Sequence, residues 1–283
     1  MGDTREIVSK AMGGVKLELL AEAYCVLKSA IRVSHDEMRT VFSEWNRGEL
    51  ADPILASAAE VLGLRDDDGN PLLEKVLDVS RGPDLCRGAA ALALELGVPA
   101  PIASQAAFSA FLSSMKDERI DASAVLSGPK AALTGERHSM IEELRKALQA
   151  AFILAYAEAY SLMAASGADK KAALAALDEQ GSAVAAAAAE ARGRRGPKET
   201  ILLDAAIKSQ LDHTLSSLRR ICARCAEGGL YAPVLMAALS FYDGIRSTWL
   251  PANLIVALRD SREGTLYERV DRPRGEAFHS VWK

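Results

Sequence analysis

Apolar residues recur in this chain at intervals of three and four almost everywhere, which is the spacing of a helix face. Leu17, Leu20, Ala21, Tyr24 and Leu27 make one such face. A second face is made by Leu144, Leu148, Ala151, Phe152, Ala155 and Ala159. The alternation of apolar and polar residues that marks a half-buried strand is nearly absent. The sequence therefore predicts an all-α fold.

Helix boundaries can be placed at several points of the pattern. Ser34 precedes His-Asp-Glu and is a suitable N-cap, because its hydroxyl can accept a hydrogen bond from a free N–H of the first turn. Pro71 follows the turn RDDDGN and is expected near the first position of another helix. Gly97, followed by Pro99 and Pro101, ends one helical pattern before the next begins.

One segment differs in composition from the rest. Residues 170–198 form an alanine-rich stretch that ends in a basic loop containing glycine and proline. Alanine has the highest helix propensity, so we expect a helix with little side chain to pack. Arg192, Arg194 and Arg195 in the loop are interpreted as solvated cations and not as a phosphate site.

The last residues lose the helical period. They read YERVDRPRGEAFHSVWK and carry Tyr267, Phe278 and Trp282 among charges and prolines. A free arm with three aromatic side chains would leave apolar area in water, so we expect the arm to lie on another surface. The sequence thus predicts a helical domain over residues 1–266 and an arm over residues 267–283.

Charge and hydropathy exclude several classes of partner. The 283 residues contain 34 Lys and Arg against 38 Asp and Glu, and this slight negative charge gives no footprint for nucleic acid. The longest apolar stretches are interrupted, for example by Gln149 and Glu158, so we expect no membrane segment. The N-terminus has charges of both signs and no apolar run, unlike a secretory signal. We expect a cytoplasmic protein.

The sequence offers no strong metal or cofactor motif. Cys222 and Cys225 form a C-x-x-C, but its context is helical and no second ligand pair follows at zinc spacing. No glycine-rich phosphate loop of either common type is present. We therefore expect no metal, no cofactor and no nucleotide-binding domain in this sequence.

Several strings are more specific than generic helical sequence. They are FSEWNRGEL at 42–50, DDDGNPLLEKVLDV at 66–79, LGVPAP at 96–101, SSMKDERIDAS at 113–123 and LSFYDGIRSTWLPANLIVALRD at 239–260. Together with the tail, they resemble the C-terminal domain of 6-phosphogluconate dehydrogenase over essentially the whole chain. The resemblance implies an all-helical domain that forms a two-fold homodimer, with each tail threading the other subunit. The family's N-terminal nicotinamide-binding domain has no counterpart in this sequence.

The resemblance also shows a departure from the family's active site. The family's first helix carries K-x-x-H-N-G-x-E-Y, in which the lysine accepts a proton during oxidation and the glutamate donates one after decarboxylation. Aligned on Glu-Ala-Tyr at 22–24, the lysine position holds Glu6, the asparagine position Lys10, and the glutamate and tyrosine positions Gly13 and Gly14. Both acid–base groups of the family are therefore replaced.

Cationic positions that the family uses for substrate are partly kept. The family's G-T-G-K-W corresponds to DLCRG at 84–88, which leaves a cation at Arg87. A phosphate-binding arginine of the family aligns near Ala185. Near the tail, the family's R-D-x-x-x-x-H keeps Arg259 but has Thr265 in place of the histidine.

Three functions follow from these observations. The first is a non-oxidising homolog that binds a phosphorylated sugar or related anion at a homodimer interface, with Arg87 of one subunit and Arg259 of the other. The second is a cofactor-independent isomerase, lyase or decarboxylase in which Glu6 and Lys10, four residues apart on one helix face, move protons; the alternative for this pair is a surface ion pair. The third is the helical half of a split dehydrogenase whose Rossmann-type subunit is a separate chain.

Overall fold

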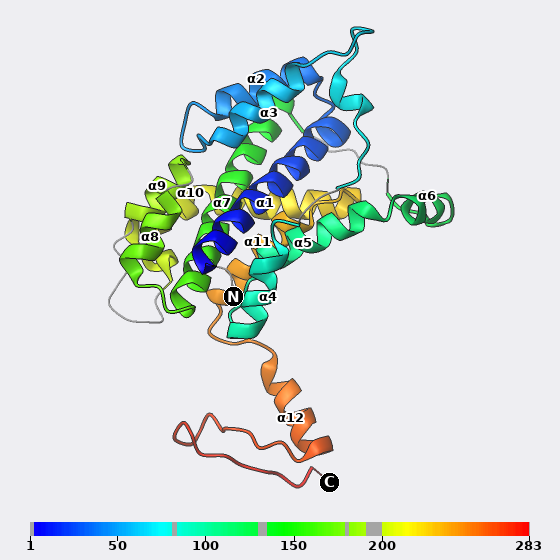
Figure 1. Cartoon of the computed structure of the whole chain (residues 1–283). Coiled ribbons are helices and arrows are strands. Elements are labelled where there is room, and N and C mark those ends of the chain that lie inside the picture. The colour runs from blue at the N-terminus through cyan, green and yellow to red at the C-terminus, as the bar shows by residue number, and fades with distance from the viewer. Residues whose placement is uncertain (1–2, 81–83, 130–134, 179–180, 191–199, 283) are drawn as a thin grey trace. The chain divides into compact units, whose positions relative to one another are not determined.

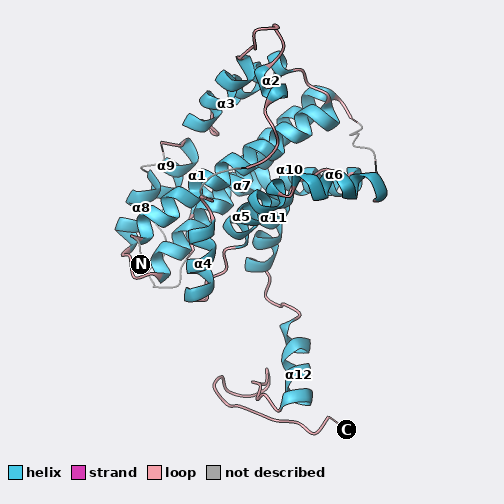
Figure 2. Cartoon of the chain, turned by 45° about the vertical axis from the view of Figure 1, so that its right-hand side comes forward, coloured by secondary structure: helices cyan, strands magenta, loops and turns pink. Residues whose placement is uncertain are grey.

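The computed structural model describes residues 3–80, 84–129, 135–178, 181–190 and 200–282. In this part of the chain the regular structure is helical (Figures 1 and 2), which confirms the predicted all-α class. The extended pairing found in the described residues consists of two isolated bridges, Arg65 with Pro71 and Tyr267 with Phe278. The chain divides into two compact units, Met1–Phe241 and Tyr242–Lys283. The predicted arm thus shares its unit with the helix that precedes it.

The helices follow one another along the chain with short connections. In order they are α1 (Thr4–Cys25), the π-helix η1 (Val26–Ile31), α2 (His35–Trp45), α3 (Pro53–Gly63), the 3-10 helix η2 (Leu72–Lys75), α4 (Arg87–Leu96), α5 (Pro101–Ser114), α6 (Lys116–Val125), α7 (Arg137–Ala165), α8 (Lys170–Asp178), α9 (Ala183–Glu190), the 3-10 helix η3 (Ile201–Leu203), α10 (Ala205–Gly228), α11 (Pro233–Ile245) and α12 (Ala252–Glu263).

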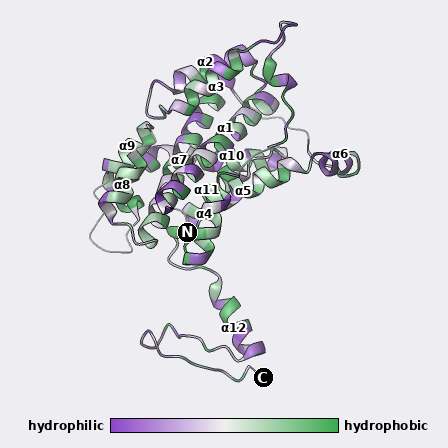
Figure 3. Cartoon of the chain, viewed as in Figure 1, coloured by the Kyte–Doolittle hydropathy of each residue, from purple (hydrophilic) through white to green (hydrophobic). Residues whose placement is uncertain are grey.

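Helix α7 is the centre of the first unit. Helices α1 and α10 pack along it, α9 and the α4–α5 pair cover further parts, and α2 and α3 pack on each other (Figure 1). By length and composition α7 could cross a membrane, but 89% of its apolar window is buried inside the protein. We therefore assign α7 to the core. Helix α6, by contrast, has no buried residue and is mostly hydrophilic in Figure 3.

The predicted boundaries at Ser34 and Gly97 are confirmed. Ser34 and Glu37 form a capping box at the start of α2. Gly97 has φ 65° at the end of α4, a left-handed conformation that glycine adopts without strain, and Pro101 begins α5. Pro71 starts only the four-residue helix η2. The residues that follow it, Val76 among them, are exposed, so a longer helix would have no surface to pack on.

The alanine-rich segment forms two short helices, α8 and α9, that pack on each other. Ala185 is completely buried where α9 meets the unit, because a side chain of this size lets helices approach closely. The position that the resemblance aligns with a phosphate-binding arginine therefore contributes packing in this chain. Arg192, Arg194 and Arg195 lie outside the described residues.

Candidate functional site

The first part of α1 presents one exposed stripe of residues. Glu6, Lys10, Gly13 and Leu17 are spaced by three and four, which places them above one another on a single helix face. Lys10 Nζ lies 2.6 Å from Glu6 Oε1, and both side chains are about 60% exposed. The structure thus brings Glu6 and Lys10 together at the surface. An exposed i,i+4 pair of this kind stabilises a helix by about 0.3 to 0.5 kcal/mol.

Two adjacent glycines on α1 have different surroundings. A Cβ added at Gly13 would meet no atom within 4 Å, so the helix surface there is open. A Cβ added at Gly14 would lie 2.5 Å from Cys86 Sγ and 2.9 Å from Leu85 Cβ, which is too close for any side chain. Gly14 therefore permits the segment before α4 to lie directly on α1. A tyrosine, which the family has at this position, could not occupy it without displacing that segment.

Arg87 begins α4 and its side chain is exposed. Asp84 Oδ1 accepts hydrogen bonds from the backbone N–H groups of Cys86 at 2.9 Å and of Arg87 at 3.2 Å. The thiol of Cys86 donates to the Ala11 carbonyl oxygen at 3.5 Å and joins α4 to α1. Because a carboxylate already occupies this helix N-terminus, an anion would be recognised there by the Arg87 guanidinium and not by free backbone donors.

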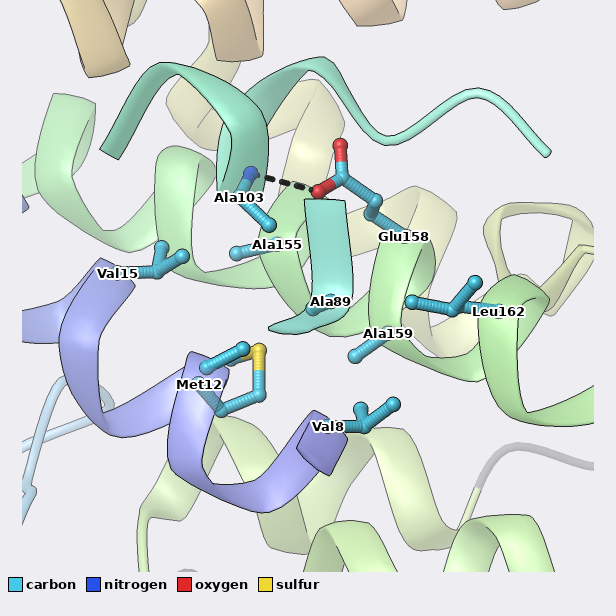
Figure 4. A pocket seen from close by; sticks show the side chains of 10 residues that line it. Val8, Met12, Val15, Ala89, Ala103, Ala155, Glu158, Ala159 and Leu162 are labelled. Carbon is cyan, nitrogen blue, oxygen red and sulfur yellow. Dashed lines mark hydrogen bonds between the residues drawn. The ribbon is translucent and has the colours of Figure 1, made fainter. Parts of the chain in front are cut away.

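A small cavity lies beside this region, between α1, α4, α5 and α7 (Figure 4). Val8 and Met12 of α1 and Leu162 of α7 form apolar walls, and Glu158 of α7 is the charged residue of the lining. The space is about the size of one water molecule, so it is too small for a sugar phosphate.

Glu158 of α7 holds the start of α5 against the core. The sequence indicated this residue only as an interruption of an apolar stretch and not as a structural residue. Its two oxygens accept hydrogen bonds from the backbone N–H groups of Ile102 at 2.9 Å and Ala103 at 2.8 Å (Figure 4 draws the second). Burial raises the pKa of Glu158 to about 8, although the two backbone donors act in the opposite direction. The signal available in the sequence was one acid within the apolar C-terminal half of α7.

Two more buried acids hold helices in the same way. Glu22 of α1 accepts hydrogen bonds from the N–H groups of Val234 at 2.6 Å and Leu235 at 2.9 Å, at the start of α11. Burial raises the pKa of Glu22 to about 8 against these donors. Asp52 caps α3 and forms a buried ion pair with Lys16 of α1, with Nζ 3.0 Å from Oδ2. These groups join α1 to α3 and α11.

Arg259 lies on α12, in the second unit. Its guanidinium is 59% exposed and its Nε is 3.5 Å from Glu263 Oε2, a weak contact. Since Arg87 belongs to the first unit, the clamp made by the two arginines stays a prediction. The neighbouring Asp260 is buried, and it accepts hydrogen bonds from the end of the arm, which the sequence did not indicate.

The cysteine pair lies inside the helical core. Cys222 and Cys225 of α10 are both buried, and burial raises the pKa of each thiol to about 12. They are therefore protonated and weakly nucleophilic at neutral pH. Among the residues that the structure describes, no three His, Cys, Asp or Glu side chains form a group that could hold a metal ion.

Comparison with known proteins gives a consistent result. Residues 7–282 match the family model of the 6-phosphogluconate dehydrogenase C-terminal domain. The decarboxylating 6-phosphogluconate dehydrogenase of Mus musculus is 36% identical over 276 residues, which cover 94% of this chain and 57% of that protein. The NADP(+)-dependent enzyme of Bacillus subtilis is 34% identical over 277 residues, covering 94% of this chain and 59% of that protein.

The fold agrees with that of a solved relative. The structure of 6-phosphogluconate dehydrogenase from Plasmodium falciparum superposes with a TM-score of 0.88 at 21% identity, covering 98% of this chain and 62% of that chain. This chain therefore spans somewhat more than half the length of the proteins that it matches. On the match of the family model over nearly all of its residues, the chain belongs to the family of 6-phosphogluconate dehydrogenase C-terminal domains.

Proposed function

We propose that this domain binds a phosphorylated sugar or a related anion between two copies of the chain, and that it does not supply the acid–base groups for oxidising that ligand. One observation carries the proposal. The α1 stripe holds a carboxylate at Glu6 and an open surface at Gly13, where the family has its lysine and glutamate, whereas Arg87 is exposed at the start of α4.

The exchanged residues change what the surface can do to a bound sugar. A lysine that accepts the proton of a hydroxyl group is replaced by Glu6, and Lys10 neutralises this acid at 2.6 Å. No side chain at Gly13 can return a proton to the product. General acid–base catalysis contributes on the order of 10² to 10⁴ in rate, so binding can persist where this contribution is gone.

The described residues also give no support to a nicotinamide site of their own. A dinucleotide fingerprint needs a strand that leads through a glycine-rich turn into a helix. The regular structure in the described part of the chain is helical, so these residues do not provide such a strand. NADP(+) is named for the relative from Bacillus subtilis, and we derive no step through it for this domain.

The second copy is supported by the surface of α12. Leu254, Ile255 and Leu258 are 62%, 60% and 52% exposed on this one helix. Such a group of large apolar side chains marks an interaction surface, and a two-fold dimer would cover both copies at once. The family resemblance implies the same arrangement, with the arm of residues 267–283 entering the partner. Arg259 would then approach the Arg87 of the other subunit.

Calorimetric titration tests the proposed site. Inorganic phosphate and 6-phosphogluconate are titrated into wild type, Arg87→Ala and Arg259→Ala, with Arg262→Ala as a control that removes an exposed guanidinium from the same helix. Charge-assisted bidentate hydrogen bonds contribute about 1.5 to 3 kcal/mol each, so each clamp variant should bind ten- to a hundredfold more weakly. Equal affinity in wild type and both clamp variants, or no binding by wild type, contradicts the proposal.

A second candidate function rests on the contact between Glu6 and Lys10. Their 2.6 Å separation places a proton donor and an acceptor at one point of the surface, as an isomerase, lyase or decarboxylase without a cofactor requires. Loss of a phosphosugar turnover in both Glu6→Gln and Lys10→Met, with binding retained, would favour this candidate. The third candidate is the helical half of a split dehydrogenase. It predicts that a separate Rossmann-type chain co-purifies with the protein. The cytoplasmic location stays a prediction.

A further inference from the structure

Asp260 is buried on a helix whose other faces are not. It is the buried residue of α12, with 1% of its surface exposed, whereas the large apolar side chains of the same helix face outward. A carboxylate is costly to remove from water unless it receives hydrogen bonds. The arrangement of α12 is therefore the reverse of an ordinary amphipathic helix, and Asp260 must have a task inside the second unit.

The carboxylate of Asp260 receives the end of the arm. Oδ1 lies 2.7 Å from His279 Nδ1, and Oδ2 accepts hydrogen bonds from the Ser280 backbone N–H at 3.1 Å and from the Trp282 indole Nε1–H at 2.6 Å. Burial raises the pKa of Asp260, but the hydrogen bonds together outweigh burial and lower the pKa below its ordinary value. The acid is thus fully engaged by residues about twenty positions away.

Further contacts join the beginning of the arm to its end. Tyr267 and Phe278 exchange two backbone hydrogen bonds, of 3.0 and 2.8 Å. The hydroxyl groups of Tyr267 and Ser280 form a hydrogen bond, and the rings of Tyr267 and Trp282 lie 6.0 Å apart. Residues 267–282 therefore return to the last turn of α12 through contacts within one chain.

Arg259 precedes Asp260 on α12, about 100° around the helix. Adjacent helical residues do not face each other, so the carboxylate of Asp260 is turned to the three donors of the arm while Arg259 lies on a different face. The guanidinium is exposed, and its ion-pair partner among the residues that the structure describes is Glu263, at 3.5 Å. The closed arm thus fixes α12 and directs its cation outward.

We propose that Asp260 is a positioning residue: it closes the arm in each subunit before assembly and keeps Arg259 available for the anion. The part that concerns the anion rests on the proposed function above. The closure itself does not, because it depends only on contacts within the second unit. A second copy of the chain would then receive a preformed loop and not a disordered tail.

The test compares Asp260→Asn with Ser261→Ala, a control at the exposed neighbouring position of the same helix. Hydrogen exchange of the Trp282 indole and of the Ser280 amide reports the closure, and Trp282→Phe assigns the indole signal among the three tryptophans. Both protons should exchange at least tenfold faster in Asp260→Asn, because the asparagine amide turns a donor toward one of these donors. Ser261→Ala should exchange as wild type does.

Phosphate titration supplies the second measurement. Asp260→Asn should lose about as much affinity as Arg259→Ala, at least tenfold, and the double variant should lose no more than Arg259→Ala alone, since one residue acts through the other. Unchanged exchange in Asp260→Asn overturns the closure. Faster exchange with unchanged phosphate affinity overturns the positioning of Arg259 and leaves the anion site intact.

The remaining outcomes are also informative. If wild type binds no phosphate, the proposed function fails, and exchange alone decides whether Asp260 closes the arm. If Asp260→Asn does not fold, Trp282→Phe retains an aromatic side chain but removes one donor to Asp260, and the Ser280 amide should then exchange severalfold faster. Wild-type exchange of that amide in Trp282→Phe would contradict the closure by the arm.

Discussion

The two units of the chain place their apolar and acidic residues in opposite ways. In the first unit, α7 is apolar and buried, and each buried acid near it is held by the N-terminus of another helix. In the second unit, the leucines of α12 face outward and the buried residue is Asp260. The first unit has a core of its own, whereas α12 in the second unit leaves its large apolar side chains exposed.

The largest expected effect comes from removing the arm. A chain ending at residue 266 loses Tyr267, Phe278 and Trp282, each able to bury on the order of 150 to 250 Å². We expect sedimentation to show monomers or aggregates in place of a dimer, while circular dichroism retains the helices of the first unit. A truncated protein that remains a dimer with an unchanged melting temperature would show that the second unit does not depend on a partner in this way.

Breaking the buried ion pair should affect the first unit strongly. Lys16→Ala leaves the carboxylate of Asp52 buried without its partner, which typically costs 3 to 5 kcal/mol of unfolding free energy. Lys10→Ala removes an exposed lysine from the same helix and should cost less than 1 kcal/mol. Urea denaturation measures both. Similar losses in the two variants would mean that Asp52 is not confined as the structure shows.

The buried acids predict a pH dependence of stability in the first unit. Because the folded-state pKa values of Glu22 and Glu158 are raised from 4.5 to about 8, the folded protein holds these protons more tightly than the unfolded chain does. The free energy of unfolding should therefore fall as pH rises from about 4.5 to about 8, by up to about 1.4 kcal/mol per pH unit for each group, and then level off.

Substitution separates these acids from exposed ones. Glu158→Gln should flatten the pH profile measured by urea denaturation between pH 5 and 8. Glu136→Gln is the matched control at the start of α7, where backbone hydrogen bonds lower the pKa of an exposed acid. The stability that Glu136 contributes through its lowered pKa is lost as the pH falls below 4.5. A wild-type profile that rises between pH 5 and 8 would contradict the raised pKa values.

The smallest effects distinguish the two glycines of α1. Gly14→Ala should be destabilising, since its Cβ would meet Cys86 and Leu85 and the start of α4 would have to move. Gly13→Ala has open space and a helical backbone, so we expect it to stabilise by about 0.5 to 1 kcal/mol. Thermal unfolding compares them. Equal shifts of the same sign would show that α4 does not rest on α1 at Gly14.

Features that depend on residues close in the sequence were predicted well. The N-cap at Ser34, the helix end at Gly97 and the shared helix face of Glu6 and Lys10 each involve residues within four positions. Pro71 predicted a helix, and the structure has only the short helix η2 there, because the residues that follow are exposed and have no surface to pack on. Local spacing therefore specified the helices and their ends but not their depth of packing.

The structural acids were not predictable in the same way. Glu22 meets the N–H of Val234 across 212 positions, and Glu158 meets Ile102 across 56. The partners of these acids have no side-chain signature, because the donors are backbone N–H groups. Such groups lack a partner within their own helix only in its first turn, so the contact depends on where the other helix begins and packs. The anion site is different again: Arg87 and Arg259 were identified by family resemblance, and their joint role stays a prediction.

The hydrogen bonds between Glu22 and the start of α11 have a consequence for synthesis of the protein. Translation proceeds at about 5 to 20 residues per second, so roughly 10 to 40 s separate the emergence of Glu22 from that of Val234. During this interval α1 has no partner for its acid, and the carboxylate must stay in water. Although α1 precedes α11 by some two hundred residues, its buried acid is therefore satisfied only after α11 has been synthesised.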